Sequence, residues 1–198
     1  VDIFVKLTKL DTSAEPSEVF DFVREVVEER YGDRAEVQRR SIKIDFDRDR
    51  DGFAVDVVPA VRNGNQWALP NGDPDRWKVD DERWITTDPE TLGDLTSMRN
   101  KNPKFGDTGI YVPTVKLMRQ IRSHHRGDRK PGGLFIELHT YWAFERGITG
   151  DTWPEVLAAT LRSVADAMSS RDPLIDPVLG TEYEPLPGQA ELDANARQ

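Results

Sequence analysis

Two short apolar stretches, each carrying one aspartate, constrain the fold of this chain more than any other feature. VDIFV at residues 1–5 contains Asp2, and FAVDVVPA at residues 53–60 contains Asp56. Both stretches are rich in β-branched residues, and polar and apolar positions alternate over residues 2–8, which is typical of half-buried strands. A carboxylate in such a strand is costly to bury unless it is paired with a cation or binds a metal. The fold must therefore give each of these side chains a partner.

Strand patterns occupy the first third of the chain. After the strand at residues 2–8, a helix is predicted over residues 16–32, followed by a hairpin with strands at 40–46 and 53–61. Residues 62–83 are rich in Asn, Gly, Pro and Asp, and we predict that they form a long loop held in place by its two tryptophans.

Helix patterns fill the second half. Helices are predicted to begin near Pro89, Pro113, Gly133 and Thr152, where a proline in the first turn or a capping-box spacing marks a start. A tail that runs over the surface is expected after Pro173. We therefore predict an α+β fold, in which a β-rich core is followed by a helical bundle.

The composition of the chain excludes several structural and functional classes of protein. The chain has no cysteine, which excludes disulfide scaffolds, zinc knuckles, iron–sulfur clusters and thiol catalysis. It has neither an apolar run of the ~20 residues that span a bilayer nor a signal-peptide core, so we expect a cytoplasmic protein without membrane contact. It also lacks the glycine-rich phosphate loops of P-loop and Rossmann proteins.

The net charge of −9 disfavours binding to duplex DNA or RNA, which needs a basic face. Basic residues nevertheless concentrate in residues 116–130, Lys116 and Arg119 among them. Asp128 is the single acidic residue in this stretch. Such a run is either a solvated helix face or a patch that holds a few phosphates, as on a nucleotide.

Two other motifs favour plainer interpretations. The turn DRDRDG at 47–52 resembles the start of an EF-hand loop, but Val58 stands where the bidentate glutamate belongs, so we predict a solvated hairpin turn. The three histidines, His124, His125 and His139, lack the spacing of a zinc site, and we expect them at surfaces or helix ends.

The two strand aspartates carry the stronger chemical signal. If their strands are neighbours, Asp2 and Asp56 converge on one cation, and two hard carboxylates completed by phosphate oxygens and water suit Mg²⁺. The alternative is a strand aspartate paired with an arginine or lysine, and the residues alone leave both interpretations open.

The order of a D-I-F-V strand, a helix and a hairpin ending in VDVVPA resembles the polymerase-β-like nucleotidyltransferases. That resemblance implies a mixed sheet with helices on one face and a site for Mg²⁺ or Mn²⁺. Asp2 matches the second member of the family's acidic pair, and Asp56 matches its third aspartate. The first member and the Gly-Ser motif would precede residue 1, so we expect an N-terminally truncated and inactive chain.

The second half is similar to the bacterial cGAS/DncV-like nucleotidyltransferases (CD-NTases), through WITTDP at 84–89, Asn100, the helix at 115–119 and GLFIEL at 133–138. Arg119 stands where the family usually has a lysine, and Gly133 stands where it commonly has a serine. The resemblance implies that Arg119, with Lys116 as runner-up, binds nucleotide phosphate. We expect a nucleotidyltransferase core at 1–85, a helical domain at 86–180 and a tail at 181–198.

The resemblance further implies synthesis of cyclic or linear oligonucleotide second messengers from NTPs in bacterial antiphage (CBASS) signalling, with a regulatory protein as a further partner. Two alternatives stay open. The same strands occur in transferases of the tRNA CCA-adding or poly(A) type, although the −9 charge argues against an extended RNA surface. A catalytically inactive relative that only binds nucleotide or a partner protein is the other.

Overall fold

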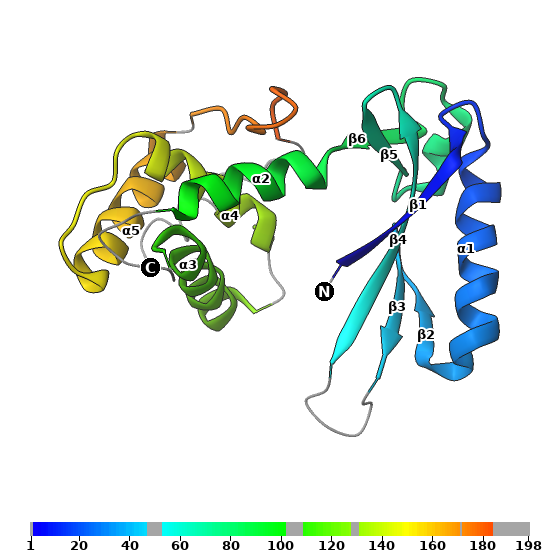
Figure 1. Ribbon diagram of the computed structural model, residues 1–198, viewed down its shortest axis with the longest axis horizontal. Coiled ribbons are helices and arrows are strands. Elements are labelled where there is room, and N and C mark those ends of the chain that lie inside the picture. The colour runs from blue at the N-terminus through cyan, green and yellow to red at the C-terminus, as the bar shows by residue number, and fades with distance from the viewer. Residues whose placement is uncertain (1, 47–52, 102–108, 128–130, 171, 184–198) are drawn as a thin grey trace. The chain divides into compact units, whose positions relative to one another are not determined.

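The computed structural model describes residues 2–46, 53–101, 109–127, 131–170 and 172–183. The chain divides into a first unit, Val1–Asp88, and a second unit, Pro89–Gln198. Among the described residues, the first unit contains the strands and one long helix, and the second contains four helices (Figure 1). This is the α+β fold expected from the sequence.

The first unit is built on a six-stranded mixed sheet. Its strands are β1 (Asp2–Asp11), β2 (Ala35–Val37), β3 (Ile42–Asp45), β4 (Ala54–Asn63), β5 (Gln66–Pro70) and β6 (Trp84–Thr87). The long strand β4 is central: it pairs in parallel with β1 along one edge, and antiparallel with β3 and then β5 along the other. The remaining pairs, β2–β3 and β5–β6, are also antiparallel, so β1 alone makes the sheet mixed.

Helix α1 (Pro16–Tyr31) covers one face of this sheet (Figure 1). Its apolar side chains repeat at helical spacing, and Phe20, Val23 and Val27 pack on buried residues of β3 and β4. Burying each such side chain contributes about 1.5–3 kcal/mol. The helix ends as predicted at Gly32, which has a φ of 55° and whose N–H donates to the carbonyl of Glu28.

The prediction of a long loop over residues 62–83 is wrong. Strand β4 continues to Asn63, a tight turn with Gly64 at φ 60° follows, and β5 then returns along β4. A short 3₁₀ helix, Pro74–Lys78, fills much of the remainder. The tryptophans do hold the segment: Trp67 is buried, and the indole N–H of Trp77 donates to the carbonyl of Asn71 at 2.7 Å.

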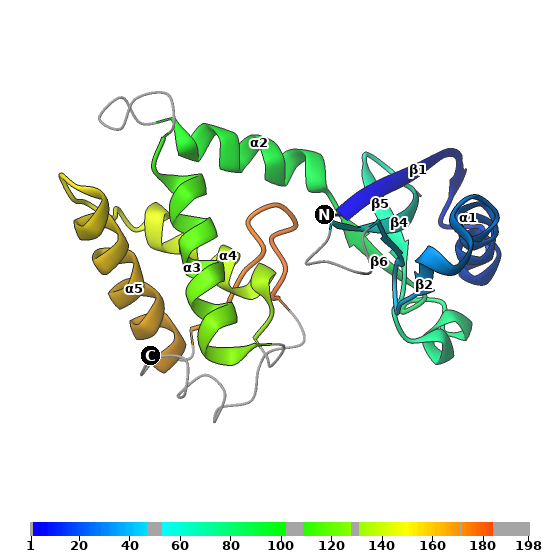
Figure 2. The same ribbon diagram turned by 90° about the horizontal axis from the view of Figure 1, so that it is seen from below.

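The second unit contains α2 (Pro89–Asn100), α3 (Tyr111–Arg126), α4 (Gly133–Glu145) and α5 (Trp153–Ser170). Helix α4 packs against both α3 and α5 (Figure 2) and buries seven of its thirteen residues. At the start of α5, Glu155 accepts the backbone N–H of Thr152 at 3.1 Å, as the capping-box spacing predicts.

The segment after Pro173 does not simply run over the surface. Leu174 is 3 % exposed and belongs to the core of the second unit, and Tyr183 packs on that core. An antiparallel bridge joins Ile175 to Glu182, and the indole N–H of Trp142 donates to the carbonyl of Ile175. The expected tail at 181–198 thus begins with residues that close a small loop on the core.

No helix in the described parts of the chain is long and apolar enough to cross a membrane. The turn at 47–52, which resembles part of an EF-hand loop, lies outside the described residues.

Candidate active site

The parallel pairing of β1 and β4 places Asp2 directly opposite Asp56. Strand partners in register project their side chains to the same face of a sheet, so the two carboxylates share one face. The next residues on that face are Phe4 opposite Val58, then Lys6 opposite Ala60. We call this face of β1 and β4 the Asp face; α1 covers the opposite one.

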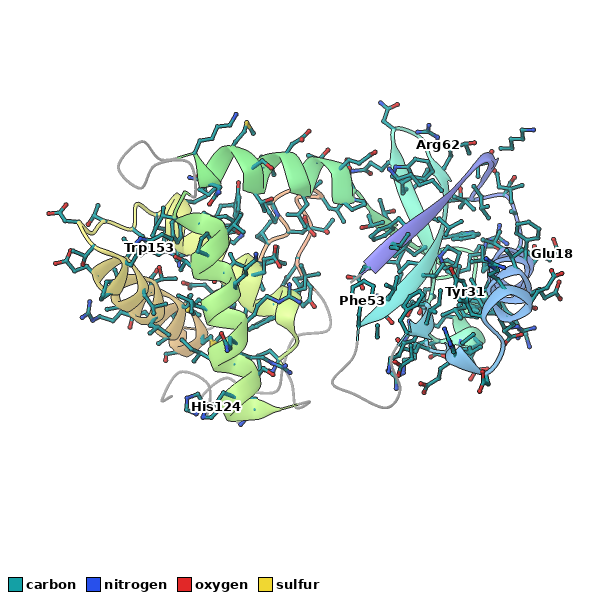
Figure 3. The ribbon with its side chains drawn as sticks, turned by 60° about the horizontal axis from the view of Figure 1, so that its bottom comes forward. Glu18, Tyr31, Phe53, Arg62, His124 and Trp153 are labelled. Carbon is teal, nitrogen blue, oxygen red and sulfur yellow. The ribbon has the colours of Figure 1, made fainter. Side chains whose placement is uncertain are left out.

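The Asp face changes character along its length. At one end lie the two aspartates, and in the middle Phe4 packs on a buried apolar cluster that includes Val58 and Trp67. At the other end two cations lie over the Trp67 ring: Lys6 Nζ at 4.8 Å and the Arg62 guanidinium at 4.4 Å from its centroid. Figure 3 labels Phe53, which immediately precedes β4, and Arg62, which lies near the other end of that strand. On β1 and β4, apolar residues thus separate the two aspartates from Lys6 and Arg62.

The environment of Asp56 distinguishes between the two interpretations of the strand aspartates. Its Oδ1 atom is buried and has no hydrogen-bond partner among the described residues. Lys43 lies directly opposite Asp56 on β3, but its Nζ pairs with Asp45 Oδ2 at 3.9 Å. An unpartnered buried oxygen costs about 1–3 kcal/mol, which a bound cation would offset. No cation of the described residues reaches this oxygen, so the geometry favours one supplied by a ligand.

The donor set is small. No group of three or more histidine, cysteine, aspartate and glutamate side chains that could hold a metal occurs in the described parts of the chain. Mg²⁺ is commonly bound through only one or two carboxylates, with waters and substrate phosphates completing its octahedron. Asp2 and Asp56 fit that role, with most ligands left to water and substrate.

The other predicted site residues lie on α3, in the second unit. Lys116 and Arg119 are both exposed, one helical turn apart. Arg119 Nη1 lies 3.4 Å from Glu137 Oε2 on α4. Burial raises the pKa of the Glu137 carboxyl, and the neighbouring Arg119 charge opposes this rise. The structure therefore brings together Asp2 with Asp56 in one unit, and Arg119 with Glu137 in the other.

Glu137 was not expected among the site residues, although its motif contains a signal for it. An acid within the otherwise apolar run GLFIEL needs a partner when the helix is buried. Arg119 is that partner. The guanidinium also lies against Gly133, whose bare Cα gives it room: a Cβ added there would be 2.9 Å from Arg119 Nε.

The three histidines differ in their exposure to solvent. His124 and His125 are exposed near the end of α3, as expected. The same expectation is wrong for His139, which is 4 % exposed within α4 and packs edge-on against Phe135 with ring centroids 4.5 Å apart. Burial, with a contribution from Arg146, lowers the pKa of His139 to about 4, so the ring is neutral at pH 7.

The chain matches no family model, and no curated protein matches its sequence. Solved structures do match. The Bradyrhizobium diazoefficiens CD-NTase CdnG in complex with GTP aligns with a TM-score of 0.76 at 16 % identity, over 99 % of this chain and 67 % of CdnG. E. coli MS115-1 CdnC with ATP aligns with a TM-score of 0.67 at 17 % identity, over 99 % of this chain and 67 % of CdnC. Elizabethkingia meningoseptica CdnE cyclic dinucleotide synthase aligns with a TM-score of 0.69 at 12 % identity, over 99 % of this chain and 74 % of CdnE.

The chain has the fold of the CD-NTases. The alignments include both units, since they cover nearly all of this chain, and the chain spans about two thirds of the length of CdnC and CdnG. At these identities the likeness concerns the fold. The chemistry of the site rests on the residues described above.

Proposed function

We propose that this chain belongs to a metal-dependent nucleotidyltransferase that makes cyclic or linear oligonucleotide second messengers from NTPs in bacterial antiphage (CBASS) signalling. The observation that carries the proposal is the pairing of Asp2 with Asp56 on adjacent parallel strands, with a buried Asp56 oxygen left unpartnered. The fold supports it, because similar structures include CdnC with ATP, CdnG with GTP and a protein described as a cyclic dinucleotide synthase.

Asp2 and Asp56 would hold Mg²⁺ or Mn²⁺. When bound, such an ion lowers the pKa of an attacking hydroxyl and stabilises a leaving pyrophosphate. The chain contributes position and charge. The sheet fixes the two carboxylates side by side, and the apolar middle of the Asp face keeps them apart from Lys6 and Arg62. Because those cations already lie on Trp67, the aspartates remain available to an incoming metal–nucleotide complex.

Arg119 and Lys116 would bind the triphosphate. Arg119 brings a planar guanidinium that can contact two phosphate oxygens at once, whereas Lys116 brings a compact ammonium. Both are exposed on α3, and Arg119 forms an ion pair with Glu137. We further propose a regulatory protein partner, supported by the similar structure of CdnC solved in a complex with a HORMA protein.

A non-catalytic nucleotide-binding protein is the second candidate. It is favoured by the small donor set, since the described residues contain no group of three metal-binding side chains. It predicts NTP binding without release of pyrophosphate.

The test measures pyrophosphate release and oligonucleotide products from mixed NTPs with the natural gene product, in Mg²⁺ and in Mn²⁺. Asp56→Asn should reduce turnover at least about a hundredfold, because it weakens charge stabilisation at the reacting centre. The matched control is Asp21→Asn on α1, which covers the opposite face of the sheet and carries a surface ion pair with Arg24. Near-normal turnover in Asp56→Asn would refute the assignment.

Two other results would redirect the proposal. NTP binding without any turnover by the wild-type protein would support the non-catalytic candidate. Transfer of nucleotides to tRNA in preference to free NTPs would support an RNA-acting transferase.

A further inference from the structure

Gly133 lies so close to the Arg119 guanidinium that a side chain at position 133 would require this group to move. Its φ lies outside the left-handed region, so any residue could adopt its backbone. A Cβ on Gly133 would nevertheless lie 2.9 Å from Arg119 Nε, 3.0 Å from Nη2 and 3.2 Å from Cζ. These three atoms stand at the end of a flexible side chain, so a Cβ at position 133 would shift the guanidinium from its present place.

Glu137 holds the same guanidinium from one turn further along α4. Residues four apart lie on the same face of a helix, so Gly133 and Glu137 form a continuous surface. Arg119 Nη1 lies 3.4 Å from Glu137 Oε2, with 21 % of the Glu137 side chain exposed against 55 % for Arg119. The guanidinium thus contacts α4 at Glu137 and Gly133, while more than half of the Arg119 side chain stays exposed, which leaves N–H donors of this five-donor group for a ligand.

We propose that Gly133 and Glu137 are positioning residues for Arg119: the bare Cα of Gly133 seats the guanidinium, and Glu137 orients it so that its outward N–H groups meet the phosphates of an NTP. The inference rests on the proposed function for the identity of the ligand, but the packing of Arg119 on Gly133 does not depend on it. It makes Arg119 and Gly133 a matched pair, because a side chain at 133 and a guanidinium at 119 compete for one volume.

A positioning role and a merely structural role of Gly133 predict different effects of Gly133→Ala on nucleotide affinity. Gly133 is the first residue of α4, and replacing glycine by alanine in a helix ordinarily stabilises it. If Gly133 were only part of the helix, Gly133→Ala would leave the protein folded and nucleotide binding unchanged. If it seats Arg119, the variant folds but loses affinity for nucleotide.

The control is the adjacent glycine. A Cβ on Gly132 would meet no heavy atom within 4 Å, and Gly132 also lacks a positive φ. Gly132→Ala therefore makes the same chemical change one residue away without touching Arg119.

The first measurement needs no nucleotide. The pKa of the Glu137 carboxyl is followed by NMR in the full-length protein labelled at glutamate, with Glu137→Gln identifying the signal. Displacing Arg119 removes the charge that opposes the effect of burial, so the pKa should rise further in Gly133→Ala and in Arg119→Ala, but not in Gly132→Ala. Tyr111, which also lies near Glu137, stays protonated throughout because burial raises its pKa. An unchanged pKa of the Glu137 carboxyl in Gly133→Ala would refute the inference that Arg119 packs on Gly133.

The second measurement is the affinity for Mg²⁺–ATP and Mg²⁺–GTP. Gly133→Ala should weaken binding about tenfold, the effect of losing one charge-assisted contact. On an Arg119→Lys background the same substitution should have no effect, because a lysine lacks the planar group that needs the space.

The outcomes separate the two proposals. A Glu137 titration that moves while affinity for NTP does not would overturn the positioning role and leave the proposed function intact. A wild-type protein that binds no NTP would overturn the proposed function and the phosphate contact together, while the Glu137 titration would still decide whether the seat exists.

Discussion

Asp56 and Glu137 are both partly buried carboxylates in otherwise apolar stretches of sequence, but they differ in whether a charged partner is at hand. Glu137 on α4 receives a partner from within the protein, since Arg119 reaches it from α3. Asp56 on β4 receives none from the described residues: its Oδ1 is buried without a hydrogen bond there, and the neighbouring Lys43 pairs with Asp45 instead.

The difference separates two kinds of functional residue. A buried carboxylate with an internal partner has its desolvation offset by the fold, and its role is to hold that partner in place. A buried carboxylate without one has its desolvation offset only when something binds. The first kind points to positioning within the protein, and the second to a ligand from outside.

A buried titratable group that stays neutral needs neither an internal partner nor a ligand of opposite charge. His139 is such a group. Its pKa is lowered to about 4 by burial, against about 6.5 when unfolded. Between these values the unfolded state binds more protons, so the free energy of unfolding falls as the pH falls from above 6.5 toward 4. The contribution of His139 is about 3 kcal/mol between pH 8 and pH 4.

Urea unfolding near those two pH values, in wild type and in His139→Asn, measures this contribution. The variant should lose about 3 kcal/mol less than the wild type on acidification. Equal losses in the two proteins would show that His139 is not held neutral by the fold.

Metal binding provides the direct test of the contrast between the two carboxylates. Mn²⁺ affinity, followed by its electron paramagnetic resonance signal, should fall about tenfold or more in Asp56→Asn, because one of two anionic ligands is lost. Glu137→Gln should leave it unchanged, since Arg119 already occupies that carboxylate. Equal losses in both variants would abolish the distinction drawn between them.

The sequence contained enough to predict the strand half of this site. Alternation over residues 2–8 and the apolar run around Asp56 place both aspartates on strands and on one face of each. That the strands are parallel neighbours in register at these residues is a long-range fact, which local patterns do not encode. The segment 62–83 was misjudged because its turn-forming residues conceal the short strand β5, which is specified by pairing with β4.

The helical half was predictable in its starts but not in its contacts. Prolines and a capping box mark where helices begin, because they act within one turn. The fit between Gly133 and Arg119 involves two helices, and the sequence suggested only that Gly133 lacks a hydroxyl. The burial of His139 was missed for a similar reason: α4 is buried on most of its surface, so no polar face marks which side points outward.

Two hydroxyls in the second unit repeat the contrast on a smaller scale. Tyr111 is 1 % exposed, and its hydroxyl has no partner among the described residues, whereas the hydroxyl of the buried Thr140 donates to the carbonyl of Ile136 at 2.8 Å. Tyr111→Phe keeps the ring and its edge-on contacts with Tyr141 and Phe144. It should therefore stabilise the protein by up to about 1 kcal/mol, because an unsatisfied polar group is removed.

Thr140→Val should instead destabilise the protein by about 1 kcal/mol, because a hydrogen-bonded hydroxyl is lost at nearly constant volume. The two free energies of unfolding, measured by urea titration at neutral pH, should thus differ in sign. If Tyr111→Phe destabilised the protein as much as Thr140→Val does, the Tyr111 hydroxyl would have a partner in solution. The inference from an unpartnered buried oxygen to an external ligand would then lose its support at Asp56 as well, since both rest on the same kind of observation.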